Sequence, residues 1–170
     1  MNTVAVVGLG ANLGDAEASV RGAIAVLDLL PATHLLHAST LYRTPAWGQV
    51  EQPDFINAVA VLETGLGARA MLDRLLAIER DFGRIRTAGE RWGPRTLDLD
   101  LLLFGDDVID EPGLQVPHPH LHERAFALLP LAEIAPGMRI PGLGVVGELA
   151  ASMASDGIEA ISWATVPRSP

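Results

Sequence analysis

The sequence predicts an α+β fold in which an antiparallel sheet carries helices on one face. Three observations support it: apolar runs with strand-like alternation, two stretches with helical spacing, and their order along the chain. That order is strand, helix, strand, strand, helix, strand, which is the split βαβ arrangement of ferredoxin-like folds. We expect a single domain over residues 1–170, because such a length suits one compact unit.

The first strand and helix are joined by a glycine-rich turn. A buried strand over 3–8 runs into the turn 8–14, and Asp15 then stands where a helix N-cap belongs. Apolar residues recur at helical spacing as far as Leu27, and Pro31 ends the pattern. The turn has three residues between its last two glycines, where a dinucleotide-binding turn has two, so a tight connection is favoured over a nucleotide loop.

The remaining elements follow from the same periodicities. They are strands over 35–42, 55–63 and 97–104, helices over 68–82, 125–134 and 145–153, a polar loop over 83–94 and a short extended piece near Val108. In the strand 55–63, alternate residues beginning with Phe55 and Asn57 share one face.

Composition excludes several classes of function. The net charge is −9, which argues against a nucleic-acid partner. All 12 basic residues are arginine, so lysine-based phosphate loops and Schiff bases are excluded, and cysteine is absent. No apolar run is long enough to span a membrane, and the N-terminus does not resemble a secretion signal. We therefore expect a cytoplasmic protein with no membrane contact, and we also expect it to be a monomer.

The densest chemical segment is an arginine-rich loop that leads into a strand with two aspartates. Arg84, Arg86, Arg91 and Arg95 lie in this loop, and Asp98 and Asp100 follow on one face of the strand. Two neighbouring carboxylates favour Mg²⁺, which takes one or two carboxylates together with water and phosphate oxygens. The alternative is a structural salt-bridge network with the arginines, and the spacing alone separates the two readings only slightly.

Two other segments suggest ligands. Thr44, Pro45 and Trp47, with Phe55 and Asn57 on the next strand, fit a small planar ligand, since an amide can donate and accept hydrogen bonds and an aromatic ring can stack. The alternative is that the aromatic residues belong to the core. The histidines at 118, 120 and 122 alternate with residues that include two prolines, which favours an extended loop over a zinc site.

These segments together resemble one enzyme family, the hydroxymethyl-dihydropterin pyrophosphokinases. The resemblance rests on four blocks, in order along the chain: residues 42–45, 52–58, 90–100, and 116–118 followed by 124–126. It covers the chain from Val4 to about Pro136. It implies transfer of pyrophosphate from ATP to 6-hydroxymethyl-7,8-dihydropterin, giving the pterin diphosphate and AMP, in tetrahydrofolate biosynthesis.

The resemblance also implies roles for residues. Asp98 and Asp100 would bind two Mg²⁺ ions, and Arg84 and Arg95 would assist transfer. The residues implied to contact ATP or lie near it are Arg86, Arg91, Trp92, His118 and Arg124. The residues implied to form the pterin pocket are Thr44, Pro45, Trp47, Phe55, Asn57 and Phe126. The arginine loop 84–94 would be a mobile catalytic loop.

The chain departs from the family pattern at Phe55, Gly89, Gly113 and Pro119. Two other classes of function remain as alternatives: a metal-dependent nucleotidyl transferase, which would release pyrophosphate, and a pterin-binding domain without catalysis.

Overall fold

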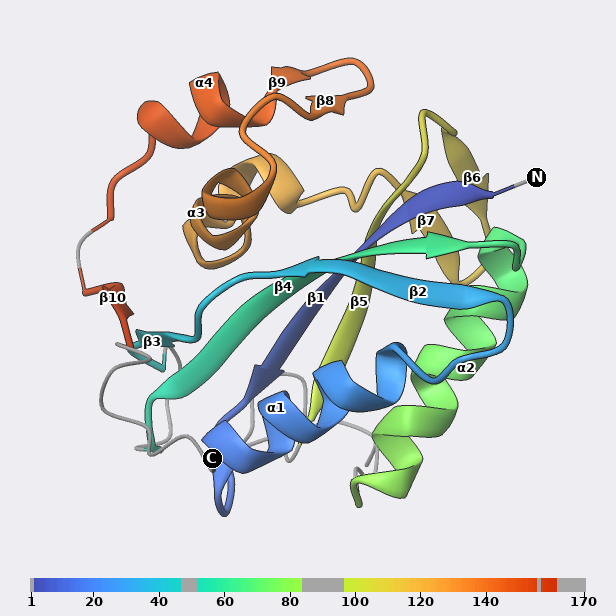
Figure 1. Ribbon diagram of the computed structural model, residues 1–170. Coiled ribbons are helices and arrows are strands. Elements are labelled where there is room, and N and C mark those ends of the chain that lie inside the picture. Colours follow the sequence, from blue (N-terminus) through green and yellow to red (C-terminus); the bar gives the residue numbers. More distant parts are fainter. Residues whose placement is uncertain (1, 47–51, 84–96, 156, 162–170) are drawn as a thin grey trace.

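The computed structural model describes residues 2–46, 52–83, 97–155 and 157–161 (Figure 1). The strands are β1 (Thr3–Ala11), β2 (Thr33–Ala38), β3 (Tyr42–Thr44), β4 (Phe55–Thr64), β5 (Asp98–Phe104), β6 (Ile109–Glu111), β7 (Leu114–Val116), β8 (Arg139–Ile140), β9 (Gly144–Val145) and β10 (Glu159–Ala160). The helices are α1 (Ala16–Leu27), α2 (Ala68–Asp81), the 3₁₀ turn η1 (Leu121–Glu123), α3 (Ala125–Ile134) and α4 (Val146–Ala151).

The main sheet is antiparallel throughout. Its order is β10, β3, β4, β1 and β5, and β2 pairs with a different stretch of β4. The two long central strands, β1 and β4, are joined over nine residue pairs from Thr3–Thr64 to Ala11–Ile56. This arrangement confirms the predicted α+β fold with an antiparallel sheet.

The strand predicted over 35–42 is in fact two strands, β2 and β3. The interruption falls at Ser39, whose backbone N–H donates to the Val59 carbonyl at 2.9 Å. The hydroxyl of Ser39 accepts the Val59 N–H, also at 2.9 Å. A side-chain oxygen thus replaces the backbone acceptor that a continuous strand would supply, so the ladder to β4 stops and restarts.

Helices cover both faces of the sheet, which corrects the prediction that they lie on one face. In Figure 1, α1 and α2 lie below the sheet, and α3 and α4 lie above it. Alternate residues of the strands serve the two cores, because successive side chains point to opposite faces. The first core includes Val7, Leu9, Ala58, Ala60, Leu62, Leu99 and Leu101 with α1 and α2, and the second includes Val6, Val59, Val61, Leu102 and Leu103 with α3 and α4.

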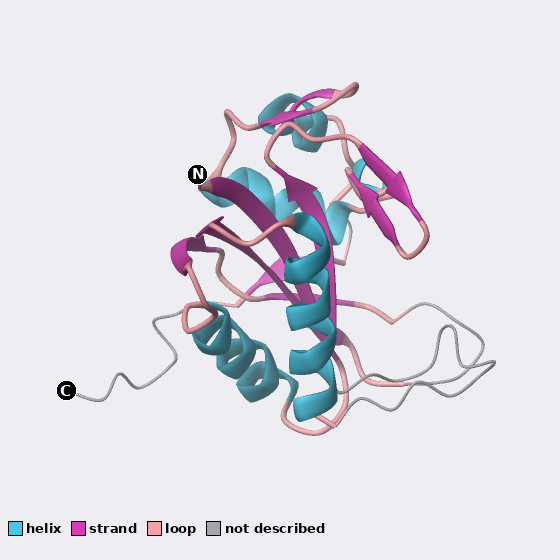
Figure 2. Ribbon diagram, turned by 90° about the vertical axis from the view of Figure 1, so that its right-hand side faces the viewer, coloured by secondary structure: helices cyan, strands magenta, loops and turns pink. Residues whose placement is uncertain are grey.

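Local signals placed the first helix correctly. The Asp15 side chain accepts the Ala18 N–H at 3.1 Å, which is the predicted N-cap. Two short ribbons, β6–β7 and β8–β9, lie outside the main sheet (Figure 2). Among the described residues, no helix is long and apolar enough to cross a membrane.

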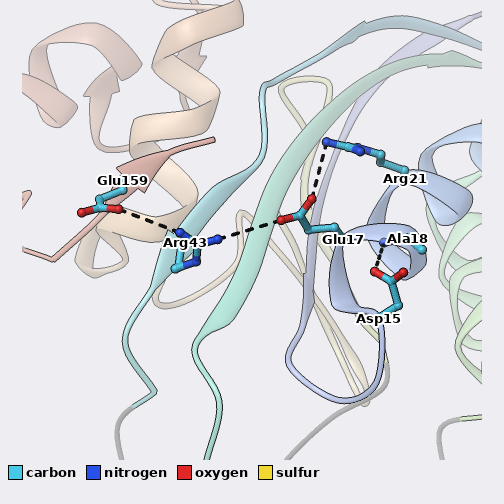
Figure 3. A network of polar contacts seen from close by, with 6 residues as sticks. All are labelled: Asp15, Glu17, Ala18, Arg21, Arg43 and Glu159. Carbon is cyan, nitrogen blue, oxygen red and sulfur yellow. Dashed lines mark hydrogen bonds and ion pairs between the residues drawn. The ribbon is translucent and has the colours of Figure 1, made fainter. Parts of the chain in front are cut away.

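Strand β3 is held from the α1 side by an ion-pair network (Figure 3). Arg43 reaches Glu17 of α1 at 3.9 Å and Glu159 of β10 at 4.0 Å, and Glu17 also faces Arg21 at 3.8 Å. These pairs are largely exposed, and such pairs contribute little to stability. Because side chains alternate along a strand, Tyr42 and Thr44 lie on the opposite side of β3 from Arg43.

Candidate active site

One half of the upper sheet face is polar, and it brings the predicted site residues together. The strand register places Gly10 of β1 directly between Asn57 of β4 and Asp98 of β5. The next row on this face places Gly8 between Val59 and Asp100. Glycine has no side chain, so nothing from β1 separates the amide of Asn57 from the carboxylate of Asp98. The side chains of Asn57 on β4 and Asp98 on β5 start two strand spacings apart, about 10 Å.

Asp98 and Asp100 occupy the upper face of β5 beyond the apolar core. Leu97, Leu99 and Leu101 point into the lower core, which confirms the alternation expected for this strand. The Asp100 side chain is 35% exposed, so its carboxylate can reach ligands or solvent. The strand therefore presents two carboxylates side by side, with apolar residues behind them.

Arg124, just before α3, lies over Asp100. Its Nη1 is 3.5 Å from Asp100 Oδ2, and its guanidinium carbon is 5.7 Å from the centre of the Phe126 ring. This contact joins the start of α3 to β5. It also keeps the salt-bridge reading of Asp100 open, because one arginine of the chain does pair with this carboxylate.

His118 lies near Asp98 and Arg124 and is neutral at physiological pH. Its backbone N–H donates to the Leu102 carbonyl at 2.9 Å, which fixes it to β5. Burial lowers the pKa of His118 to about 4, with help from the charges of Arg124 and His120, while Asp98 acts in the opposite direction. The backbone N–H of His120 donates to Nδ1 of the His118 ring at 3.1 Å. The neutral His118 ring therefore carries its proton on Nε2. This leaves an uncharged donor at Nε2.

The other side of the site is formed by β3 and β4. Asn57 is 7% exposed and donates from Nδ2 to the Thr44 hydroxyl at 2.8 Å. Phe55 pairs with Thr44 in the β3–β4 ladder and lies on the same face of β4 as Asn57. The bond to Thr44 fixes the Asn57 amide, leaving its carbonyl directed toward the Gly10 position, where an added Cβ would lie 2.8 Å from Oδ1.

Glu79, for which the sequence analysis predicts no functional role, lies behind the aspartates in the structure. This α2 residue is 2% exposed, and its Oε2 accepts the Leu99 N–H at 2.8 Å. Leu99 stands between Asp98 and Asp100, so Glu79 ties the outer edge of β5 to α2. An acidic residue at an apolar position of a helix was the available signal.

Comparison with known proteins identifies the family. The sequence profile of the family described as 7,8-dihydro-6-hydroxymethylpterin-pyrophosphokinase (HPPK) matches residues 6–136. The chain belongs to this family. The matched span agrees with the extent of the resemblance seen in the sequence, and it includes Asp98, Asp100, His118 and Arg124.

Curated relatives carry the corresponding enzyme name. The 2-amino-4-hydroxy-6-hydroxymethyldihydropteridine pyrophosphokinase of Pseudomonas aeruginosa is 45% identical over 158 residues, covering 93% of this chain and 96% of the relative. The enzyme of the same name from Bacillus subtilis is 42% identical over 134 residues, covering 79% of each protein. These members of the pyrophosphokinase family have lengths similar to that of this chain.

Solved structures support the fold. A Plasmodium falciparum HPPK-DHPS crystal structure with pterin and p-hydroxybenzoate has a TM-score of 0.73 and 14% identity. The match covers 94% of this chain and 47% of the Plasmodium chain, so this chain spans less than half of that protein. At such low identity the likeness bears on the fold alone.

The described part of the chain holds nine of the predicted site residues. They are Thr44, Pro45, Phe55, Asn57, Asp98, Asp100, His118, Arg124 and Phe126, the last in the first turn of α3. The predictions for Trp47, Arg84, Arg86, Arg91, Trp92 and Arg95, and for a mobile loop over 84–94, lie outside the described residues.

Proposed function

We propose that this chain transfers pyrophosphate from ATP to 6-hydroxymethyl-7,8-dihydropterin, giving the pterin diphosphate and AMP for tetrahydrofolate biosynthesis. Family membership supports the reaction. The observation that carries the assignment to this site is the register that places the side-chain-free Gly10 between Asn57 and Asp98. It puts a candidate pterin contact and a candidate metal ligand in one row across the sheet.

The chemistry of the aspartate pair fits magnesium. Among the described residues no three histidine, aspartate or glutamate side chains gather as a metal-binding group, and Mg²⁺ accepts one or two carboxylates when water and phosphate oxygens complete its shell. We therefore propose that Asp98 and Asp100 hold Mg²⁺, two ions in all as the family resemblance implies. When bound, the metal would neutralise charge on the ATP phosphates.

The protein's own residues would bind and align the two substrates. Arg124 can donate to a phosphate oxygen from its place above Asp100. His118 can donate from neutral Nε2 without adding charge. On the other side of Gly10, Asn57 and Thr44 would meet the polar edge of the pterin, and Phe55 and Phe126 would stack on its faces. Arg84 and Arg95 would assist transfer, and Arg86, Arg91, Trp92, Trp47 and Pro45 would complete the two binding sites.

In the proposed step the hydroxyl oxygen of the pterin attacks the β-phosphorus of ATP. A bond forms between this oxygen and the β-phosphorus, the bond from that phosphorus to the bridging oxygen of the α-phosphate breaks, and AMP leaves. The hydroxyl proton is released to solvent. Catalysis then depends chiefly on alignment and on stabilisation of phosphate charge.

The decisive experiment supplies ATP, Mg²⁺ and the pterin alcohol and identifies the nucleotide product. AMP supports the proposal. Release of pyrophosphate would indicate a nucleotidyl transferase instead, and the absence of turnover with intact pterin binding would indicate a binding domain.

The matched variants are Asp98→Asn and Asp110→Asn. Asp98→Asn keeps the shape of the side chain but removes a metal-binding charge, so turnover should fall by at least ~100-fold while the folded structure persists. Asp110 lies on the β6–β7 ribbon, where it accepts from Gln115, and its substitution should leave turnover unchanged. Equal activity of both variants would contradict the role of Asp98. The monomeric state and the cytoplasmic location stay predictions.

A further inference from the structure

Helix α3 is attached to the sheet at both of its ends. At its start, Arg124 pairs with Asp100 on β5, one edge of the sheet. Near its end, Glu133 binds the segment that enters β3, on the other side of the sheet. Figure 1 shows α3 above the strands, crossing them rather than following them.

The length of the helix matches the width of sheet that it crosses. From Arg124 to Glu133 an α-helix rises about 13 Å. Three strand spacings, from β5 through β1 and β4 to β3, amount to about 14 Å. The row beneath the helix runs from Asp100 through Gly8 and Val59 to Ser39. Helix α3 therefore links β5, which carries Asp98 and Asp100, to β3, which carries Thr44 of the candidate pterin pocket.

The Glu133 carboxylate accepts from three donors at the start of β3, two on Thr40 just before the strand and one on Tyr42, its first residue. The Thr40 N–H donates to Oε2 at 3.0 Å, the Thr40 hydroxyl donates to Oε1 at 2.7 Å, and the Tyr42 hydroxyl donates to Oε1 at 2.5 Å. Burial raises the pKa of Tyr42 to about 12, and its hydrogen bond to Glu133 adds to the effect. Tyr42 is therefore a neutral donor, and hydrogen bonds to a carboxylate are the stronger kind.

The same strand carries the residue that orients Asn57. Tyr42 and Thr44 lie on one face of β3, two residues apart. Thr44 accepts the Asn57 amide, while Phe126 stands on the first turn of α3. A change in the position of α3 relative to β3 would therefore alter the separation between Phe126 and the pair of Asn57 and Thr44.

We propose that Glu133 is a positioning residue for the pterin pocket. By holding the end of α3 on Thr40 and Tyr42, it fixes the gap between Phe126 on the helix and Phe55 and Asn57 on the sheet. The inference rests on the proposed function, because it concerns the site at which the pterin would bind.

The test uses the full chain with Glu133→Gln, Glu133→Ala and Tyr42→Phe. The first keeps an acceptor without the charge, the second removes the contact, and the third keeps the aromatic ring without its hydroxyl. Glu159→Gln is the matched control, because Glu159 is also an exposed glutamate that contacts β3, but through Arg43 on the opposite side.

Two dissociation constants are measured by calorimetry, one for 6-hydroxymethylpterin and one for ATP with Mg²⁺. Glu133→Ala and Tyr42→Phe should weaken pterin binding about tenfold, which corresponds to ~1.4 kcal/mol, with ATP binding changed less than about twofold. Glu133→Gln should give a smaller loss of pterin affinity, and Glu159→Gln should give none. A general structural role would instead weaken both ligands alike, and that result would overturn the proposal.

The contact itself is tested in solution by a titration that does not depend on function. Tyr42 is the only tyrosine of the chain, so the ultraviolet absorbance of tyrosinate reports on it alone. Glu133→Gln should lower its pKa from about 12 toward 10, and only part of the way, since burial is the larger cause. If the titration shows the contact but the variants bind pterin as the wild type does, the positioning role is wrong. If the wild type binds no pterin, the proposed function fails together with it.

Discussion

Gly10→Ala tests whether the orientation of Asn57 determines pterin affinity, without removal of any polar group. A methyl group at position 10 would lie 2.8 Å from Asn57 Oδ1, where ordinary contact begins at 3.4 Å, so the amide must retreat by roughly the difference. Asn57 is buried and bonded to Thr44, and its movement strains or breaks that bond. A buried polar group left without its partner costs about 1–3 kcal/mol.

The strained bond lowers the stability of the folded protein by about 2 kcal/mol, and the preference for alanine over glycine in a strand, about 0.5–1 kcal/mol, offsets part of that loss. Because the displaced amide no longer stands where it would meet the pterin, we expect pterin affinity to fall by about 10-fold, with ATP affinity close to that of the wild type. Calorimetry with 6-hydroxymethylpterin and with ATP and Mg²⁺ measures the two separately, and denaturant unfolding measures stability.

Gly8→Ala is the matched control on the same face of the same strand. Its added methyl group meets Leu102 Cδ1 at 3.2 Å, the end of a flexible side chain, and not the Asn57 amide. This variant should lose some stability and keep its pterin affinity. Wild-type pterin affinity in Gly10→Ala, or equal losses in the two variants, would refute the argument that Gly10 keeps the Asn57 amide in place.

Two further predictions concern pH and stability. His118 should titrate with a pKa of about 4 by NMR. This pKa lies below the value of about 6.5 that histidine has in the unfolded chain. Between about pH 6.5 and pH 4 the unfolded chain therefore binds a proton at His118 that the folded protein does not bind, and the free energy of unfolding falls as the pH drops through this range. His118→Gln should show a shallower fall over that window in denaturant unfolding, and an identical pH dependence would contradict the shift. Asp15→Ala removes the cap of α1 and should lower the free energy of unfolding by about 0.5–2 kcal/mol, whereas Asp15→Asn should restore most of it.

Local patterns in the sequence were enough to predict the main elements of the fold. Alternation along residues 97–101 predicted that Asp98 and Asp100 share a face, and the lower core confirms that the leucines between them point the other way. The Asp15 cap was predictable because it depends on residues within one turn of the helix. The break at Ser39 was not, because it depends on a hydrogen bond to Val59, a residue 20 positions away.

The same limit applies to the candidate site. Residue types and spacing singled out Asn57, Asp98 and Asp100, whereas the roles expected for His118 and Arg124 came from the family resemblance. No local pattern indicated that Glu79 would bind the backbone of Leu99, and the functional roles of the residues within 84–96 stay predictions.

The sequence by itself determined the order of the elements, the side of each strand on which its side chains lie, and the membership of the pyrophosphokinase family. Only the tertiary structure decided that α3 and α4 cover the upper face, that Gly10 stands between Asn57 and Asp98, and that Glu133 reaches Tyr42. The reason is physical. Periodicity shows which face of an element is apolar, whereas the element that covers this face is selected by packing between residues far apart in the chain.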